Sequence, residues 1–273
     1  MRYGQTIPRV IVLTGASGLL GRSMTQALMR AGHRVVLVDA NVEPLRPLVD
    51  AYGAESGGVA LCPVDLTSDT AAETVERTAL EAFGRIDMLV NNAAFTAFAA
   101  WPVADQAPKP WEVPTKLARK FFDINMLAQH ALIAQMLPGM IERGWGRLIN
   151  ITCSYYNMQR LYPYGATKAA LEALTAAIEL DLKGTGVTAN TLNPGGAVRT
   201  PELVAANPDL VWWVGADVMN AALLFLASPL SDGIEGRRYI GSRFAGAAPW
   251  YTAIEQGSGS LEWYGFGTVP GTQ

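Results

Sequence analysis

The stretch that decides the fold is VIVLTGASGLLG, residues 10–21. Residues 10–13 are a short apolar run, which is typical of a strand buried on both faces of a parallel sheet. The run leads into a turn containing Gly15, Gly18 and Gly21, and residues 22–30 read as a helix. Glycines let the backbone turn tightly and approach a pyrophosphate, and the helix N-terminus offers it N–H groups and a positive dipole end. We therefore predict a strand, a phosphate-binding turn and a helix.

Asp39 completes this unit. A second apolar run at residues 35–38 ends at Asp39, 18 residues beyond Gly21. A carboxylate at this point can accept hydrogen bonds from the adenosine ribose hydroxyls, and it would repel a 2′-phosphate. No Lys or Arg lies between residues 14 and 21. The sequence therefore predicts a dinucleotide-binding unit that takes NAD rather than NADP.

The alternation of strands and helices continues along the chain and predicts one α/β domain over residues 1–273. Repeated strand–helix units give a parallel sheet with helices on both faces. We expect a doubly wound Rossmann-type fold with about seven strands. The expected strands are 10–13, 35–38, 59–64, 86–90, 146–151, 187–192 and 239–241, and the expected helices are 22–30, 70–83, 116–140, 164–183 and 218–227.

Four segments lack this periodicity. Residues 95–115 carry four prolines, and residues 197–217 combine prolines with two adjacent tryptophans, so we expect both to be substrate loops. Residues 155–163 are expected to form a tyrosine-rich loop. Residues 243–273 form a tail rich in glycine and aromatic residues.

Composition excludes several classes of protein. Half of the 273 residues are hydrophobic, only 16% are charged, and the net charge is −3 with no basic run, so nothing indicates nucleic acid. Cys62 and Cys153 form no CxxC pair, and His33 and His130 are isolated, so we expect no metal site and a reducing compartment. We see no signal peptide and no apolar run of the ~20 residues that a bilayer requires. We expect a soluble, cytoplasmic protein that does not bind membranes.

Tyr164 and Lys168 form the chemical centre of the prediction. They are four residues apart at the start of an expected helix, so their side chains lie on one face. A nearby ammonium group stabilises phenolate and lowers the pKa of a tyrosine from about 10 toward neutrality. A tyrosine of this kind can act as a general acid or base on a substrate oxygen.

Taken together, the chain resembles the short-chain dehydrogenase/reductase family over roughly residues 8–243. The residues that carry the resemblance are Thr14-Gly15 to Gly21, Asp39, Asp65, Asn91-Asn92-Ala93, Asn125, Ser154, Tyr164, Lys168 and Pro194-Gly195. The resemblance implies that Tyr164 is the general acid/base and that Lys168 assists it and holds the nicotinamide ribose. It further implies that Ser154 hydrogen-bonds the substrate oxygen, and that Asn125 anchors a water that links Lys168 to solvent.

The same resemblance, with the turn and strand ends described above, gives a set of cofactor-binding residues. They are Gly15, Ser17, Gly18, Leu19, Leu20, Gly21, Asp39, Asp65, Leu66, Asn91, Ala93, Tyr164, Lys168, Pro194, Gly195, Gly196 and Thr200. Asp65 and Leu66 would flank the adenine, and Asn91 would approach the adenosine ribose. Residues 194–196 would border the nicotinamide, and Thr200 would meet its carboxamide.

The chain departs from the family pattern at several positions. Counting three residues from Asn150 places Cys153 at the family serine, but the hydroxyl of Ser154 is the better donor to a carbonyl oxygen. We therefore expect Ser154 in this role, with Cys153 and Thr152 as alternatives. Ala94 replaces a glycine, and about ten extra residues precede Asn125. The Gly15/Gly18/Gly21 spacing resembles the extended, sugar-nucleotide-modifying branch.

The leading hypothesis is an NAD-dependent dehydrogenase of secondary alcohols or reductase of ketones, whose partner is a small-molecule substrate. Aromatic residues in the loops and tail either pack in the core or a subunit interface or line the pocket, and in the second case the substrate is hydrophobic or aromatic. They are Trp101, Trp111, Tyr155, Tyr156, Trp212, Trp213, Trp250 and Trp263. The alternatives are a sugar-nucleotide epimerase or dehydratase and a non-catalytic dinucleotide-sensing regulator. The resemblance also implies a homotetramer or homodimer built through the helices that contain Asn125 and Tyr164.

Overall fold

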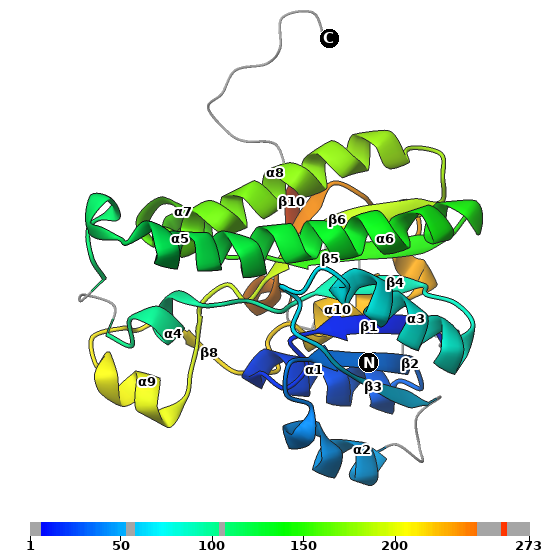
Figure 1. Ribbon diagram of the computed structural model, residues 1–273, viewed down its shortest axis with the longest axis horizontal. Helices are drawn as coiled ribbons and strands as arrows, with labels where there is room; N and C mark the ends of the chain where they lie inside the picture. The colour runs from blue at the N-terminus through cyan, green and yellow to red at the C-terminus, as the bar shows by residue number, and fades with distance from the viewer. Residues whose placement is uncertain (1–6, 53–57, 104–106, 245–257, 261–273) are drawn as a thin grey trace, which may run out of the picture.

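A sheet of eight strands forms the centre of the computed structural model, which describes residues 7–52, 58–103, 107–244 and 258–260 (Figure 1). The strand order is β10-β9-β6-β5-β4-β1-β2-β3, and every pair is parallel except β9 with β10. The strands are β1 (Val10–Thr14), β2 (Arg34–Asp39), β3 (Val59–Pro63), β4 (Met88–Asn91), β5 (Gly146–Ile151), β6 (Val187–Asn193), β9 (Arg237–Ile240) and β10 (Ser258–Ser260). The predicted doubly wound α/β fold is confirmed.

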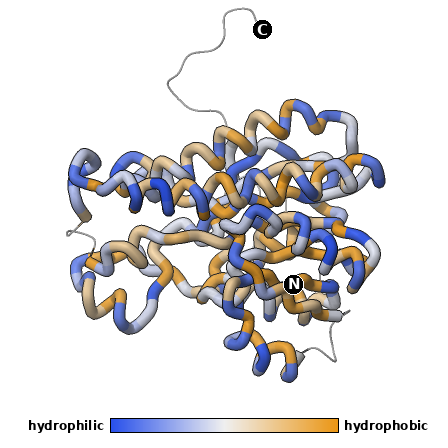
Figure 2. Tube along the Cα trace, in the orientation of Figure 1, coloured by the Kyte–Doolittle hydropathy of each residue, from blue (hydrophilic) through white to orange (hydrophobic). Residues whose placement is uncertain are grey.

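Successive residues of each strand face opposite sides of the sheet, as the pleat requires. In β1, Ile11 and Leu13 belong to one core cluster, whereas Val12 belongs to the other. Both clusters are apolar, which explains why the strands read as unbroken hydrophobic runs rather than as alternating ones. Figure 2 shows these runs as hydrophobic segments through the centre of the molecule.

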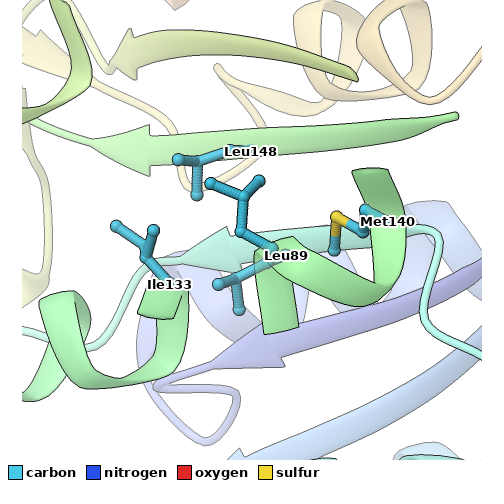
Figure 3. Close-up of a pocket in the computed structure, with 5 residues that line it drawn as sticks. Leu89, Ile133, Met140 and Leu148 are labelled. Carbon is cyan, nitrogen blue, oxygen red and sulfur yellow. The ribbon is translucent and has the colours of Figure 1, made fainter. Parts of the chain in front are cut away.

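Helices cover both faces of the sheet. On one side lie α1 (Leu19–Arg30) and α10 (Asn220–Leu226), packed on each other and on Ile11 and Leu13. On the other side lie α3 (Ala71–Phe83), α6 (Ala128–Glu142) and α8 (Tyr164–Leu182), packed on Val12 (Figure 1). The small apolar pocket of Figure 3 is a gap in this second cluster, between α6 and strands β4 and β5, and is lined by Leu89, Ile133, Leu137, Met140 and Leu148.

Several sequence-based expectations are corrected. Residues 155–163 were expected to be a loop, but α7 (Tyr155–Arg160) occupies most of them, because the Ser154 hydroxyl caps its first turn. Helix α2 (Arg46–Tyr52) and the short helix α4 (Ala97–Ala100) were not predicted. The sheet has an eighth strand because β10, from the expected tail, pairs with β9. Residues 245–257 and 261–273 of the tail, with Trp250 and Trp263, lie outside the described residues.

The two expected substrate loops contain short elements at the carboxyl end of the sheet. Residues 95–115 hold α4 and the 3₁₀ turn η3 (Pro110–Glu112). Residues 197–217 hold β7 (Ala197–Val198), α9 (Pro201–Ala206) and β8 (Trp213–Val214), with β7 paired to β8. In Figure 1, α4 and α9 lie together beside the sheet, on the side where α7 also lies. None of the described helices is long and apolar enough to cross a membrane.

Candidate active site

The glycine turn after β1 forms a tight cradle. Gly15 has φ +63°, and a Cβ atom there would stand 2.7 Å from the Cα of Ala93. A Cβ atom at Gly21 would stand 2.1 Å from the carbonyl oxygen of Gly15. Gly18 precedes α1, and no side chain caps the free N–H groups of its first turn. The turn therefore fits a pyrophosphate at the helix N-terminus.

Asp39 is held beside this turn at the end of β2. Its Oδ2 accepts a hydrogen bond from the backbone N–H of Ser17 at 3.0 Å, and its Oδ1 accepts one from the N–H of Asn41 at 3.2 Å. An ionised carboxylate has about four acceptor positions, so capacity remains for two ribose hydroxyls. The arrangement fits the adenosine half of a dinucleotide.

Thr14 and Asn92 join the glycine turn to the end of β4, and sequence reasoning assigned neither of them this role. Thr14 Oγ1 accepts hydrogen bonds from the backbone N–H groups of Asn92 (2.9 Å) and Ala93 (3.0 Å). The Asn92 amide donates to the carbonyl oxygens of Thr14 and Gly15. These bonds bring Ala93, a predicted cofactor-binding residue, into contact with Gly15.

The side chain of Asn91 takes a different direction. It is fully buried and donates to Asn150 Oδ1 at 2.9 Å, across from β4 to β5. Asn150 in turn donates to Thr175 Oγ1 on α8. The side-chain amide thus connects strands beneath α8, and the expected approach of Asn91 to the ribose stays a prediction.

Asp65 follows β3 and is exposed at the carboxyl edge. Its Oδ1 accepts hydrogen bonds from the backbone N–H of Thr67 at 2.9 Å and from its hydroxyl at 2.8 Å. These bonds stabilise the charged form and lower the pKa of Asp65. The turn that they close carries Leu66, so both residues remain predicted neighbours of the adenine.

Tyr164 and Lys168 lie at the start of α8, at the carboxyl end of β5. Lys168 is buried, and its Nζ donates to the carbonyl oxygen of Ile151 at 2.7 Å. This nitrogen is 5.9 Å from the centroid of the Tyr164 ring. Burial lowers the pKa of Lys168 to about 8 and raises the pKa of Tyr164 above its ordinary value. The direction is opposite to the lowering expected from Lys168, because burial is the main cause of the shift and Cys153 adds to it.

The three alternatives for the family serine position face in different directions. Thr152 Oγ1 donates to Glu172 on α8 at 3.0 Å, away from the tyrosine. Ser154 Oγ accepts from the N–H of Asn157 at 3.3 Å as the cap of α7. Cys153 is buried, and its thiol lies near enough to Tyr164 and Lys168 for its charge to affect the pKa of both. Burial itself raises the pKa of the Cys153 thiol to about 12, so it is protonated at neutral pH.

Asn125 lies in a π-helical turn, η4 (Asp123–Leu127), between α5 (Thr115–Phe122) and α6. Its amide exchanges hydrogen bonds with the backbone of Phe95, at 2.8 Å to the N–H and 3.0 Å to the carbonyl oxygen, and donates to Thr167 Oγ1 at 3.1 Å. Asn125 thus joins the start of the first loop to α8, one residue from Lys168. Single π turns are frequent at functional sites. The water link to Lys168 stays a prediction.

Residues 194–196 follow β6. Gly195 has φ +80°, and the Ser242 backbone N–H donates to the carbonyl oxygen of Pro194 at 3.1 Å. A Cβ atom at Gly196 would stand 2.5 Å from the carbonyl oxygen of Trp212, so this glycine lets the second loop pack closely. Thr200 Oγ1 accepts from the N–H of Leu203 at 3.2 Å as the cap of α9. The Thr200 hydroxyl also donates a hydrogen bond to the Glu202 carboxylate, and its carboxamide contact stays a prediction.

The two loops and α7 contact one another over the strand ends. The Asn207 amide donates to the carbonyl oxygen of Pro102 at 3.0 Å, which joins the second loop to the first. The rings of Tyr156 on α7 and Trp212 in the second loop meet edge to face at 5.2 Å. Both rings are about half exposed. Tyr156 and Trp212 thus form an aromatic rim between α7 and the second loop.

Comparison with known proteins agrees with this geometry. The family model for short chain dehydrogenases matches residues 9–210. The chain belongs to the short-chain dehydrogenase/reductase family, whose members generally use a nicotinamide cofactor.

Similar proteins carry several dehydrogenase names. Fluoren-9-ol dehydrogenase from Terrabacter is 28% identical over 211 residues, covering 70% of this chain and 57% of that protein. L-fucose dehydrogenase from Bos taurus is 29% identical (74% of this chain and 71% of the relative), and 7alpha-hydroxysteroid dehydrogenase from Escherichia coli K12 is 26% identical (83% and 89%). The chain thus spans just over half the length of the first of these relatives.

Solved structures show the same fold. A Bacillus thuringiensis protein assigned as a 3-oxoacyl-reductase superposes with a TM-score of 0.72 at 20% identity, covering 86% of this chain and 96% of that one. A short-chain dehydrogenase from Streptomyces avermitilis gives a TM-score of 0.62 at 30% identity, covering 71% and 68%.

Proposed function

We propose that the chain is an NAD(H)-dependent dehydrogenase that interconverts a hydrophobic or aromatic secondary alcohol and its ketone. The observation that carries the proposal is the placement of Tyr164, Lys168 and Cys153 together at the end of β5. The glycine turn follows β1 at the same edge of the parallel sheet. In open α/β sheets, ligands bind at this edge.

Each residue has a role in the proposed reaction. Bound NAD would accept or donate the hydride. Tyr164 would pass a proton to or from the substrate oxygen, and Lys168 would hold the nicotinamide ribose. The substrate oxygen would receive a hydrogen bond from Ser154, or from Cys153 in its place. The Ser154 hydroxyl proton is available for this bond, because the α7 cap uses the oxygen only as an acceptor.

The choice of NAD over NADP is supported by Asp39. Its carboxylate is bonded to the glycine turn through Ser17, so it cannot easily turn away from an incoming ribose. A 2′-phosphate would bring a second negative charge to this position without a paired cation. The proposed preference is therefore electrostatic.

A hydrophobic substrate is supported by the aromatic rim. Tyr156 and Trp212 present half-exposed rings at the site, and Trp101 stacks on Phe121 beneath the first loop at 5.9 Å. Two similar proteins are named for fluoren-9-ol and a hydroxysteroid, and a third is named for L-fucose. An aromatic rim suits the first two alcohols, which carry fused hydrocarbon rings, better than it suits a sugar.

The test is a substrate panel. Purified protein would be mixed with NAD or NADP and with fluoren-9-ol, a hydroxysteroid, isopropanol or L-fucose, and reduced nicotinamide would be followed at 340 nm. We expect turnover with NAD and the first two alcohols. Tight NAD binding without turnover of any alcohol would instead support the dinucleotide-sensing alternative. Turnover of isopropanol or L-fucose alone would contradict the hydrophobic site.

We further propose a cytoplasmic homodimer or homotetramer. Leu127 is 56% exposed beside Asn125, and Leu180 is 62% exposed on α8. Both lie on the helices expected to form the subunit interface. The two cysteines are free and buried, which fits a reducing compartment. Light scattering on the wild type and on Leu180→Glu would test the assembly, and we expect a smaller particle for the variant.

A further inference from the structure

A buried ion pair lies behind the active site. Arg238 on β9 donates through Nε to both carboxylate oxygens of Glu172 on α8, at 2.9 and 3.1 Å, and also through Nη2. The Glu172 side chain is fully buried, and the Arg238 side chain is 10% exposed. A buried ion pair is weak evidence for stability, because desolvation offsets much of the attraction. The residues that the pair contacts therefore say more about its role than its contribution to stability does.

The pair contacts residues on both sides of Cys153 and Ser154. Thr152 Oγ1 donates to Glu172 Oε1 at 3.0 Å, and Arg238 Nη2 donates to the hydroxyl of Tyr155 at 2.7 Å. The Arg238 guanidinium also lies 4.2 Å from the centroid of the Tyr155 ring. The Glu172–Arg238 pair thus binds the residue before the Cys153–Ser154 segment and the residue after it.

Lys168 binds the preceding residue, at the end of β5, to α8 as well. Lys168 lies one helical turn before Glu172, on the same face of α8. Lys168 binds the carbonyl oxygen of Ile151, and Glu172 binds the next residue, Thr152. Glu172 also contributes to the raised pKa of the Cys153 thiol, which places the carboxylate near it. Ile151 and Thr152, at the end of β5, are therefore each hydrogen-bonded to a side chain of α8.

We propose that Glu172 and Arg238 are positioning residues, which act through Thr152 and Tyr155 to hold the Cys153–Ser154 segment against Tyr164. The inference rests on the proposed function, in which this segment binds the substrate oxygen. A displacement of ~1 Å in such a group can cost about 100-fold in rate. An ion pair joining β9, α8, β5 and α7 is suited to prevent such a displacement.

The test changes the two residues that the ion pair contacts and leaves Glu172 and Arg238 in place. Removing one partner of a buried pair leaves an unpaired buried charge and destabilises the fold strongly, which would confound folding with function. Thr152→Val and Tyr155→Phe each remove one bond from the pair and keep the side-chain volume. Thr188→Val and Tyr239→Phe are matched controls, because both hydroxyls are buried without a hydrogen-bond partner among the described residues.

The first measurement does not depend on turnover. Cofactor-free protein would be treated with iodoacetamide, and labelling of Cys153 and Cys62 would be followed by peptide mass spectrometry. Loss of one hydrogen bond worth about 1 kcal/mol raises the open population of a segment about fivefold. We expect Cys153 to label about that much faster in Thr152→Val and Tyr155→Phe. Cys62, buried on β3, and both control variants should keep wild-type rates.

The second measurement is steady-state kinetics with NAD and the best alcohol of the panel. We expect kcat to fall about tenfold in Thr152→Val and Tyr155→Phe, with the KM for NAD unchanged, because orientation and not cofactor binding is disturbed. A purely structural role would lower the unfolding midpoint and leave the folded enzyme's kcat intact. Wild-type labelling and kcat in both variants would overturn the proposal.

The two proposals fail in different ways. Selective labelling of Cys153 in a protein that oxidises no alcohol would reject the proposed function and uphold the positioning of the segment. Unchanged labelling in an enzyme that is active with wild-type kcat would reject the positioning and uphold the function.

Discussion

The ammonium nitrogen of Lys168 lies 2.7 Å from the carbonyl oxygen of Ile151, the last residue of β5. This hydrogen bond joins α8 to the end of β5, one helical turn after Tyr164. Burial lowers the pKa of Lys168 to about 8 and raises that of Tyr164. Burial therefore favours the neutral form of both side chains.

Replacing the phenol is the first prediction. Tyr164→Phe keeps the ring and removes the proton-transfer group, which typically contributes 10² to 10⁴ in rate, and we expect kcat to fall by roughly that factor. NAD affinity, measured by fluorescence titration, should change less than about twofold, since one hydrogen bond at most is lost. Tyr239→Phe, which removes a buried hydroxyl on β9 with no hydrogen-bond partner among the described residues, is the control. Full turnover in Tyr164→Phe would exclude the tyrosine as the acid/base.

The fold could be predicted because its signals are local. Strands β1 and β2 are built on unbroken apolar runs at residues 10–13 and 35–38, and the glycine turn is fixed by close contacts that exclude a Cβ atom at Gly15 and Gly21. Helix α7 could also have been found, since Ser154 stands at a helix N-cap position before six residues with no glycine or proline. The aromatic composition of that segment instead favoured a loop.

The detail of the site could not be predicted in this way. Lys168 binds a backbone carbonyl, and a main-chain partner leaves no trace in residue type. The π turn around Asn125 has no sequence signature that separates it from the helices on either side. Glu172 and Arg238 are 66 residues apart, and their pairing depends on β9 lying beside β6. Such contacts follow from the tertiary arrangement alone.

Cofactor preference gives the second prediction. Asp39→Asn keeps the size of the side chain and removes its charge, so the repulsion of a 2′-phosphate is lost. We expect the ratio of kcat/KM for NAD to that for NADP to fall about tenfold, which corresponds to about 1.4 kcal/mol. Asp69→Asn, an exposed change in the turn after β3, should leave the ratio unchanged. An unaltered ratio in Asp39→Asn would show that the carboxylate does not select the cofactor.

His33 gives a prediction about stability and pH. It is 1% exposed, its Nδ1 accepts a hydrogen bond from the Arg9 N–H at 3.2 Å, and burial lowers its pKa to about 4. The unfolded chain binds a proton near pH 6.5, whereas the folded chain resists it down to about pH 4. The free energy of unfolding therefore falls as the pH drops through this window, by about 2 kcal/mol between pH 7.5 and 5.

The measurement is urea unfolding of His33→Gln and the wild type at pH 7.5 and pH 5. We expect a smaller loss between the two pH values in the variant, because it has no imidazole to protonate. His130→Gln, at an exposed histidine on α6, should lose as much as the wild type. Equal losses in all three proteins would show that another group carries the acid sensitivity.

The aromatic rim gives the last prediction. Trp212 meets Tyr156 edge to face at 5.2 Å, and both rings are half exposed at the site. An aromatic contact of this kind contributes ≈ 0.5–1.5 kcal/mol beyond the area it buries, so Trp212→Ala should raise the Michaelis constant for fluoren-9-ol about fivefold. The Michaelis constant for isopropanol should hardly change, because so small an alcohol does not reach the rim. Trp111→Ala is the matched control, since Trp111 is 78% exposed in the other loop. An equal effect of the two variants, or an equal effect on both alcohols, would show that Trp212 supports the loop rather than selecting the substrate.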